Sequence, residues 1–321
     1  MRRVLITGAS GFVGMNVAAR MLRRGHAVHA LVRAAYRPWR LRDLGAAVEL
    51  HVADLLDAAA LDALFADVRP HWVLHLAAYG AYASQTDVAA CVRTNVEGTV
   101  NLIDAAARHG VERFVNTGSS SEYGFCDHAP DEDEAAHPNS LYAATKLAAT
   151  AYASYAGCSG AVHTTTLRLY SVYGPYEEPA RLIPTVVAQG LAGRFPPLVS
   201  PATARDFVFV DDVVTAYEAA LSSDVAPGAV YNVGSGVQTS LRTVADVARS
   251  YFGITGEPAW GTMEARTWDT TTWIAKTARA RAELGWEATT PFEDGFARTA
   301  VWVAERPERR SFYQTTRTPP E

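Results

Sequence analysis

Short apolar runs alternate with longer amphipathic segments through the first half of the chain. The runs are rich in Val, Leu and Ile, which is typical of buried strands, and the segments between them repeat apolar residues at helical spacing. Parallel strands need a crossover segment between them, which is usually a helix. The alternation therefore predicts a doubly wound parallel sheet with strands at 3–8, 27–33, 48–54, 72–78, 113–120 and 164–174. Helices are expected from Phe12, around 59–66, near 86–109 and around Tyr142.

The pattern loosens past residue 175, where prolines gather between Pro175 and Pro201. Two later segments, "RDFVFVDDVVTAYEAAL" and "AVYNVGSG", regain strand and helix patterns and predict a return to the sheet. We therefore expect an α/β protein with two interleaved parts. The sheet domain comprises 1–174 with a return segment at about 206–234, and a smaller α/β lobe comprises 175–205 and 235–321.

Charge and cysteine content exclude several classes of protein. The net charge of −5 gives no excess of positive charge for binding nucleic acid or an anionic membrane. The three cysteines are irregularly spaced and predict neither a disulfide framework nor a zinc site, and no other grouping has metal-ligand spacing. No run reaches the ~20 apolar residues of a membrane span. We expect a cytoplasmic protein without bound metal, nucleic acid or membrane.

A glycine-rich turn, "TGASGFVG", lies between the first strand and the first helix and contains Gly8, Gly11 and Gly14. A turn of this kind points backbone amides and the helix dipole at one place, where a pyrophosphate fits. The sequence therefore predicts a Rossmann-like domain that binds a dinucleotide. The alternative is a glycine turn that serves packing alone.

The end of the second strand bears on which dinucleotide is bound. A carboxylate at this place would hold the ribose 2′-hydroxyl of NAD. The sequence instead has Arg33, followed by Arg37 and Arg40, and a guanidinium suits the 2′-phosphate of NADP. NADP is therefore favoured over NAD, unless these arginines form a solvated loop.

Tyr142 and Lys146 are four residues apart in "YAATK", so on a helix both side chains lie on one face. With 14 tyrosines and only two lysines in 321 residues, chance would give such a pair about 0.1 times. A free phenol has a pKa of about 10. A lysine in a dry cleft beside an oxidised nicotinamide could lower the pKa of the tyrosine far enough for its phenolate to act as a base near neutral pH. With a nearby serine hydroxyl, the pair suits hydride transfer to or from a carbonyl.

From residue 3 to about 303 the chain resembles the extended short-chain dehydrogenase/reductases of the NAD-dependent epimerase/dehydratase, or nucleotide-sugar, group. The motifs that carry the resemblance stand in the family's order: "TGASGFVG", "ADL", "HLAA", "TNVEGT", "YAATK", "LRLYSVYGP", "RDFVFVDDV", "YNVGSG", "RTWD" and "LGWEATTPFEDGFARTAVW". Each motif is weak alone, but the set is specific. The resemblance implies an enzyme that acts on a nucleoside-diphosphate sugar and forms a homodimer through helices near 86–109 and 140–156.

The resemblance also implies site residues. The catalytic set is Ser119, Tyr142 and Lys146. Assigned to the cofactor are Gly8, Gly11, Phe12, Val13, Gly14, Arg33, Asp54, Leu55, Ala77, Ala78, Tyr142, Lys146 and Tyr170. Assigned to the substrate are Tyr79, Tyr82, Ser120, Ser121, Ser171, Arg181, Arg205 and Arg266, with the last two arginines at the diphosphate. The loop at 78–87 could equally be a surface loop without substrate contact.

Departures from the family pattern rank the reactions. In the dehydratases the serine or threonine four residues before "YG" is followed by an Asp-Glu or Ser-Glu pair that performs elimination, whereas here the acid, Glu122, comes one place late. Ser171 replaces the usual asparagine at the sugar. The loop at 78–87 and Arg33 favour 4-keto reduction of an NDP-4-keto-6-deoxyhexose. A 4-epimerase with recycled NAD is the alternative, and a 4,6-dehydratase or a non-catalytic cofactor sensor ranks below both.

Overall fold

The computed structural model describes residues 1–82, 84–263 and 270–316. Within these residues the largest element is a seven-stranded sheet in which every pair of neighbours is parallel, in the order β3-β2-β1-β4-β5-β6-β9. The strands are β1 (Arg3–Thr7), β2 (Ala27–Val32), β3 (Val48–Val52), β4 (Trp72–His75), β5 (Arg113–Ser119), β6 (Thr164–Leu169) and β9 (Ala229–Val233). The predicted Rossmann-like doubly wound sheet is confirmed.

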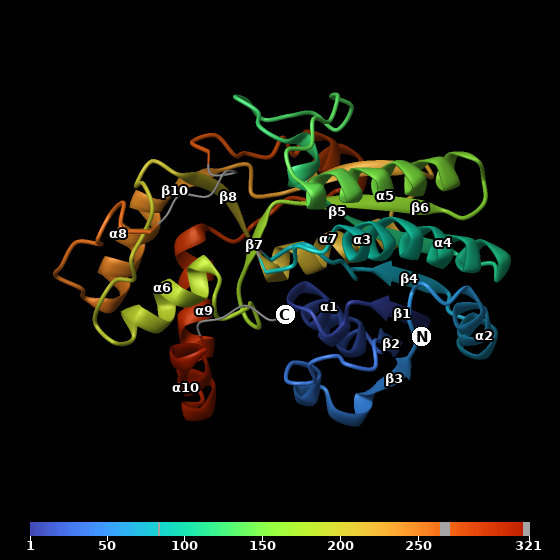
Figure 1. Ribbon diagram of the computed structural model, residues 1–321, viewed down its shortest axis with the longest axis horizontal. Helices are drawn as coiled ribbons and strands as arrows, with labels where there is room; N and C mark the ends of the chain where they lie inside the picture. The colour runs from blue at the N-terminus through green and yellow to red at the C-terminus, as the bar shows by residue number, and fades with distance from the viewer. Residues whose placement is uncertain (83, 264–269, 317–321) are drawn as a thin grey trace.

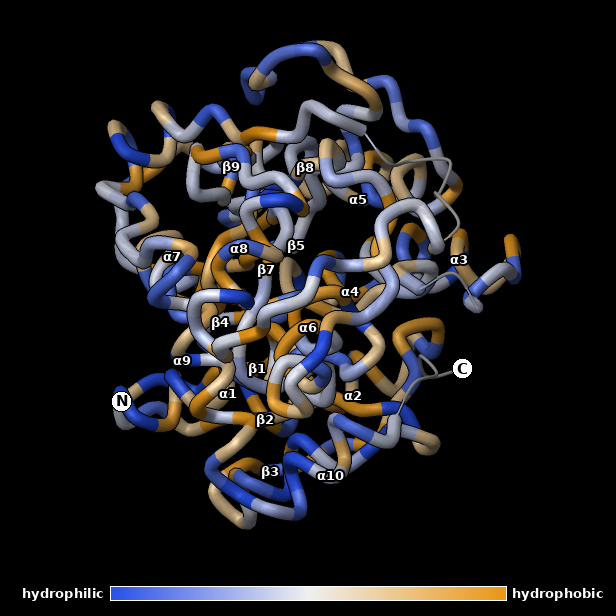
Figure 2. Tube along the Cα trace, turned by 90° about the vertical axis from the view of Figure 1, so that its left-hand side faces the viewer, coloured by the Kyte–Doolittle hydropathy of each residue, from blue (hydrophilic) through white to orange (hydrophobic). Residues whose placement is uncertain are grey.

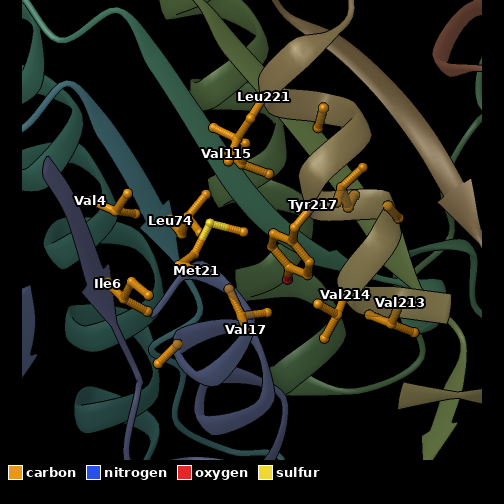
Figure 3. Close-up of a cluster of buried hydrophobic side chains, with 14 of the residues drawn as sticks. Val4, Ile6, Val17, Met21, Leu74, Val115, Val213, Val214, Tyr217 and Leu221 are labelled. Atoms are coloured by element: carbon orange, nitrogen blue, oxygen red, sulfur yellow. The ribbon is translucent and has the colours of Figure 1, made fainter. Parts of the chain in front are cut away.

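Helices cover both faces of this sheet (Figure 1). They are α1 (Phe12–Arg23), α2 (Ala58–Val68), α3 (Val88–Val92), α4 (Gly98–Arg108), α5 (Leu141–Cys158) and α7 (Val210–Ser222). Alternate residues of a strand point to opposite faces, so β1 sends Ile6 to one core and Leu5 to the other. The first core packs α1 and α7 against the sheet, with Met21 and Tyr217 in contact range of the strands (Figure 3).

The second half of the chain builds a smaller lobe beside the large sheet (Figure 1). Its sheet has the order β10-β8-β7, formed by β7 (Ser171–Tyr173), β8 (Ala204–Phe209) and β10 (Gln238–Ser240). Its helices are α6 (Leu182–Gly190), α8 (Leu241–Phe252), α9 (Phe292–Ala304) and α10 (Pro307–Thr315). In Figure 2 hydrophobic positions gather in the inner strands and helices, whereas hydrophilic positions dominate many outer loops.

The predicted strand at 164–174 divides into two, which the sequence did not indicate. β6 stays in the large sheet, and β7 pairs with β8 in the small one. The break falls at Tyr170, whose amide still donates to the carbonyl of Val233 over 3.0 Å. The sequence shows no turn residue between the two strands, so it does not indicate where the chain changes partner.

The predicted long helix near 86–109 is confirmed, with an internal irregularity. Asp87 caps α3 by accepting from the Ala90 amide over 3.0 Å. Between α3 and α4 the chain forms a π-helical turn over Arg93–Glu97. Such turns widen a helix by one residue and are frequent at functional sites. Here the turn carries Asn95, which is 1% exposed and faces the catalytic helix.

The order of the strands places the site. The chain runs from β1 outward to β3 on one side and from β4 to β6 on the other, so the direction reverses between β1 and β4. Ligands of doubly wound sheets bind beyond the carboxyl ends of the strands at this point. Gly8 follows β1 there, Ala77 follows β4, and Ser119 ends β5. Among the described residues no helix is long and apolar enough to cross a membrane.

Candidate active site

The structure brings Ser119 and Tyr142 together, and Lys146 lies one helical turn beyond Tyr142. Ser119 is the last residue of β5, and Tyr142 and Lys146 lie in the first two turns of α5. Ser140 begins that helix by accepting a hydrogen bond from the Ala143 amide over 3.1 Å. Because this cap fixes where α5 starts, it also fixes the position of Tyr142 relative to the end of β5. Ser119 and Tyr142 are joined by a side-chain hydrogen bond.

Burial sets the charge state of the pair. It raises the pKa of Tyr142 to about 12, although the hydrogen bond from Ser119 acts in the opposite direction. Burial also lowers the pKa of Lys146 to about 8 from 10.5, and Lys146 is only 2% exposed. At pH 7 the ligand-free site therefore holds a neutral phenol and an ammonium. A phenolate requires further positive charge beside the ring, which an oxidised nicotinamide would supply.

Asn95 supports the site, although the sequence analysis gave it no role. Its side-chain amide donates to the carbonyl of Tyr79 over 2.8 Å and to the Thr145 hydroxyl over 2.9 Å, and it accepts from the Tyr79 amide over 2.8 Å. Asn95 thus ties the strand-end loop to the catalytic helix between Tyr142 and Lys146. The only signal in the sequence was its place in "TNVEGT".

The glycines of the turn pack closely against the protein's own backbone. Gly8 has φ +71°, and a Cβ there would lie 2.6 Å from the amide nitrogen of Ala77. A Cβ on Gly14 would lie 2.2 Å from the carbonyl oxygen of Gly8. Gly11 begins α1, and its amide donates to that same carbonyl over 2.9 Å. This close-packed turn aims the start of α1 into the crevice, and the following residues Phe12 and Val13 form its first turn. The residues present therefore fit a pyrophosphate.

The other predicted cofactor residues lie at the carboxyl ends of neighbouring strands. Asp54 is exposed after β3, and Leu55 is 8% exposed beneath it. Ala77 is half-buried and its amide donates to the Thr7 hydroxyl over 3.2 Å, while Ala78 is exposed. Tyr170 follows β6 and is 7% exposed; its hydroxyl has no hydrogen-bond partner within the described chain.

The three arginines after β2 differ in their surroundings. Arg33 and Arg37 are exposed, so their guanidinium groups are available to a ligand. Arg40 is 5% exposed and is held by the carbonyls of Tyr176 at 2.8 Å and Ser10 at 3.2 Å. Arg40 therefore connects the glycine turn to the smaller lobe. Of the three, Arg33 and Arg37 are the ones free of such structural bonds in the described residues.

The predicted substrate residues come from several elements of both lobes. Ser120 is covered by Trp273, whose indole N–H donates to its hydroxyl over 3.2 Å. Ser121 and Ser171 are half-buried. Tyr79 is held by Asn95, and Tyr82 lies 5.9 Å from the guanidinium of Arg181. Burial raises the pKa of Tyr142, and the charge of the same Arg181 guanidinium opposes this, so Arg181 at the start of α6 acts on both Tyr82 and Tyr142.

Of the two arginines predicted to bind the substrate diphosphate, Arg205 lies within the described residues. Arg205 lies on β8, with its guanidinium 5.5 Å from the ring of Trp273 and donating to the carbonyl of Ala204 over 2.7 Å. Arg205 and Ser120 thus share Trp273 as a neighbour. Arg266 lies outside the described residues.

Glu122 is the acid that comes one place late in the dehydratase register, and its carboxylate is bonded to other residues of the protein. It is fully buried and pairs with Arg168 over 2.8 Å. Its other oxygen accepts from the Ser119 amide over 2.8 Å and the Thr150 hydroxyl over 3.0 Å. These partners occupy both carboxylate oxygens, and the bond from the Ser119 amide fixes the serine at the end of β5.

His75 is a satisfied core residue. Its Nδ1 lies 2.7 Å from the Thr7 hydroxyl and its Nε2 lies 2.9 Å from the Thr99 hydroxyl. Burial lowers the pKa of His75 to about 3, so the ring is neutral. It connects β1, β4 and the long helix.

A buried acidic pair, Glu177 and Glu178, closes the junction of the two lobes. Glu178 is paired with Arg40 over 3.1 Å. Glu177 is 6% exposed, its Oε2 lacks a hydrogen-bond partner among the described residues, and burial raises its pKa to about 8. Glu177 is therefore protonated at pH 7 in the folded protein.

Glu177→Gln should stabilise the protein in a pH-dependent manner. Above pH 4.5 the unfolded chain ionises Glu177 while the folded protein keeps its proton up to about pH 8, so the wild type loses stability across this interval. The variant has no such loss, and its advantage should grow from near zero at pH 4.5 to roughly 2–4 kcal/mol at pH 8. Urea unfolding at several pH values measures the difference.

Glu218→Gln is the opposing control. Burial acts to raise the pKa of Glu218, but hydrogen bonds from Arg20 and Arg24 outweigh it and lower the pKa to about 2. This substitution should reduce the free energy of unfolding at pH 7. A Glu177→Gln variant whose stability difference is constant from pH 4.5 to 8 would contradict the protonated state.

Comparison with known proteins agrees with this arrangement. The profile of the NAD-dependent epimerase/dehydratase family matches residues 4–234. The UDP-glucose 4-epimerase of Mycolicibacterium smegmatis is 33% identical over 321 aligned residues, covering 95% of this chain and 99% of that protein. The dTDP-glucose 4,6-dehydratase of Streptomyces griseus is 31% identical, covering 93% of both chains.

The fold has close counterparts among solved structures. The UDP-glucose 4-epimerase of Thermus thermophilus, solved as a complex with NAD, superposes with a TM-score of 0.82 at 27% identity. The superposition covers 94% of this chain and 99% of that one. Both lobes therefore have counterparts in a single enzyme.

Proposed function

Because the chain belongs to the NAD-dependent epimerase/dehydratase family and is an enzyme of the extended short-chain dehydrogenase/reductase type, we propose that it inverts the C4 hydroxyl of a nucleoside-diphosphate sugar. The observation that carries this proposal is the joined set of Ser119, Tyr142 and Lys146 at the end of β5, in a chain whose dehydratase-like acid is sequestered. Relatives at 33% and 31% identity include a 4-epimerase and a 4,6-dehydratase.

The residues divide the work of oxidising and reducing C4. Tyr142 takes the proton of the C4 hydroxyl and later returns it, while the Ser119 hydroxyl donates to the same oxygen. Lys146, charged at pH 7, stabilises the phenolate. Bound NAD supplies the acceptor and then the donor of the C4 hydride. Inversion requires the hydride to return to the opposite face of the sugar, so the pocket must let the 4-keto sugar turn over.

Elimination of water is the reaction that this site supports least. It requires a second acid or base near the C5–C6 end of the hexose. The carboxyl of Glu122 is bonded to Arg168, Ser119 and Thr150. In the dehydratase register the glutamate of the Asp-Glu or Ser-Glu pair falls at position 121, which is Ser121 here, and a hydroxyl group does not replace a carboxylate in this role at neutral pH.

A 4-keto reductase that uses NADPH is the second candidate. The exposed guanidinium of Arg33 at the end of β2 favours it, because this position suits a 2′-phosphate. In that case Tyr142 donates a proton to the C4 oxygen of a 4-keto-6-deoxysugar, and reduced cofactor is consumed in each turnover.

The smaller lobe would hold the nucleotide end of the substrate. We propose that residues 175–205 and 235–321 form this lobe and that Arg205, with Arg266, binds the diphosphate. We also propose a homodimer through the face of α3 and α5. That face exposes four large apolar side chains: Val88, Val92, Leu141 and Tyr155. Sedimentation equilibrium tests the dimer.

The first experiment identifies the resident nucleotide. Purified protein is denatured, and any released dinucleotide is identified by mass and counted against protein. We expect about one NAD per chain, because an epimerase returns its cofactor to the starting state. An empty site that takes up NADPH from solution would instead favour the reductase. Protein that binds neither dinucleotide would contradict both functions.

A further inference from the structure

Two histidines and a glutamate meet at the edge of the large sheet, away from the active site. His29 lies on β2, and Glu49 and His51 lie on the edge strand β3. The strand register places His29 opposite Glu49 and Leu31 opposite His51. Because residues two apart share a face, all three side chains point to the same side of the sheet as Leu31, which belongs to the core under α2.

The three ligand-type atoms lie at the spacing of a metal site. Nδ1 of His29 is 3.0 Å from Nε2 of His51. Glu49 presents one carboxylate oxygen to each ring, 3.4 Å from Nδ1 of His29 and 3.7 Å from Nε2 of His51. Tetrahedral ligands at the usual bond lengths of about 2.0–2.2 Å are about 3.3 Å apart. The observed separations lie on either side of that value.

Hydrogen bonding alone does not satisfy the cluster. With both rings neutral, one hydrogen lies between the two nitrogens at 3.0 Å; one nitrogen donates it and the lone pair of the other accepts it. The Glu49 carboxylate lies 3.4 Å and 3.7 Å from these nitrogens and can at best share that single hydrogen. A cation at the centre would instead bind one lone pair from each of the three side chains.

The cluster is rigid on one side and open on the other. The side chains of His29 and His51 are 11% and 14% exposed, whereas that of Glu49 is 63% exposed. Two imidazoles fixed by strand pairing thus form a preorganised pair of ligands. The carboxylate and the solvent side leave a path for an ion and a place for a water molecule as fourth ligand.

We propose that His29, Glu49 and His51 bind one divalent transition-metal ion of the zinc class. Two imidazoles and one carboxylate suit Zn²⁺ and disfavour Mg²⁺ and Ca²⁺, which prefer all-oxygen ligand sets. The ion cross-links the edge strand β3 to β2, because its ligands come from both strands. Four strand spacings separate β3 from β5, which is about 19 Å, so the ion takes no part in the chemistry at Ser119.

The sequence did not predict this metal site, because its three ligand residues do not occur at short, regular spacing. Glu49 and His51 are two residues apart, but His29 lies 22 residues before His51. Only the pairing of β2 with β3 brings them together. The proposed site therefore depends on strand register, which one sequence does not specify.

Zinc titration of the full-length, metal-depleted enzyme tests the proposal. Calorimetry and equilibrium dialysis with Zn²⁺ should give one tight site per chain. Glu49→Gln and His51→Gln should each weaken this site at least about tenfold. His128→Gln is the matched control, since its Nδ1 and Nε2 face two different carboxylates, Asp127 and Glu134, and share no common point. Its zinc affinity should equal that of the wild type.

Cobalt provides a readout of geometry. Co²⁺ bound at the cluster should give the intense visible bands of a four-coordinate site in the wild type and in His128→Gln, and should lose them in His51→Gln. Circular dichroism of the metal-free variants verifies that each is folded. Zinc binding that is unchanged by both cluster substitutions, or absent from the folded wild type, would overturn the proposal.

Discussion

Tyr142→Phe should lower turnover about 10²–10⁴-fold while leaving cofactor binding nearly unchanged. The substitution removes the hydroxyl that moves the C4 proton and keeps the ring that packs against the strand end. Ser119 loses its hydrogen-bond partner, but the glycine turn that would hold the dinucleotide is untouched. Steady-state rates with the preferred sugar nucleotide, together with the amount of bound dinucleotide, measure the two effects separately.

Tyr152→Phe is the control for this substitution. Tyr152 lies farther along the same helix, and its hydroxyl donates to Asp104 over 2.6 Å. The same atom is removed from the same helix, away from the strand end, and turnover should not change. A Tyr142→Phe enzyme with the wild-type rate would remove Tyr142 from the mechanism.

Lys146→Met should have opposite effects on activity and stability. Turnover should fall at least about 10²-fold, because the phenolate loses its neighbouring charge. Stability at pH 7 should rise by roughly 1–3 kcal/mol, since burial lowers the pKa of Lys146 to about 8 and the folded protein bears the cost of a buried ammonium. Methionine fills the same space without that cost. Denaturant unfolding and initial rates measure the two effects.

The stability gain depends on pH. Below about pH 8 the ammonium is charged in both states, so the full cost is present. Between about pH 8 and 10.5 the folded protein releases the proton before the unfolded chain does, and the wild type recovers stability. The advantage of Lys146→Met should shrink over this interval. Lys276→Met is the control, because Lys276 forms an exposed pair with Asp131 and should show neither effect. A Lys146→Met protein less stable than wild type at pH 7 would contradict the buried charge.

The large sheet could be predicted from the sequence because its strands are short apolar runs between helices. β1, β2, β3 and β4 all begin within a residue of their predicted starts. The transfer of β7 to the small sheet could not be predicted, because "LRLYSVYG" contains no glycine or proline between the two strands to mark a boundary. The π-helical turn at Arg93–Glu97 leaves helical periodicity almost unchanged and was missed for that reason.

The site was predictable where local spacing carries the chemistry. Tyr142 and Lys146 are one helical turn apart, and Gly8 and Gly14 belong to one turn, so neighbouring residues define both features. Roles set by distant contacts were not predictable. The sequence placed Arg40 with Arg33 among the arginines that suit a 2′-phosphate, whereas in the structure Arg40 is buried against Tyr176 and Ser10.

Product analysis by NMR tests the account most directly. The enzyme is incubated without added cofactor with UDP-glucose, UDP-glucuronate, dTDP-glucose and dTDP-rhamnose, and the sugar protons are followed. The account predicts that one of these converts to a mixture of C4 epimers with its C6 group unchanged, and that Tyr142→Phe abolishes the conversion. Formation of a 4-keto-6-deoxy product from dTDP-glucose would show that elimination occurs and would contradict it.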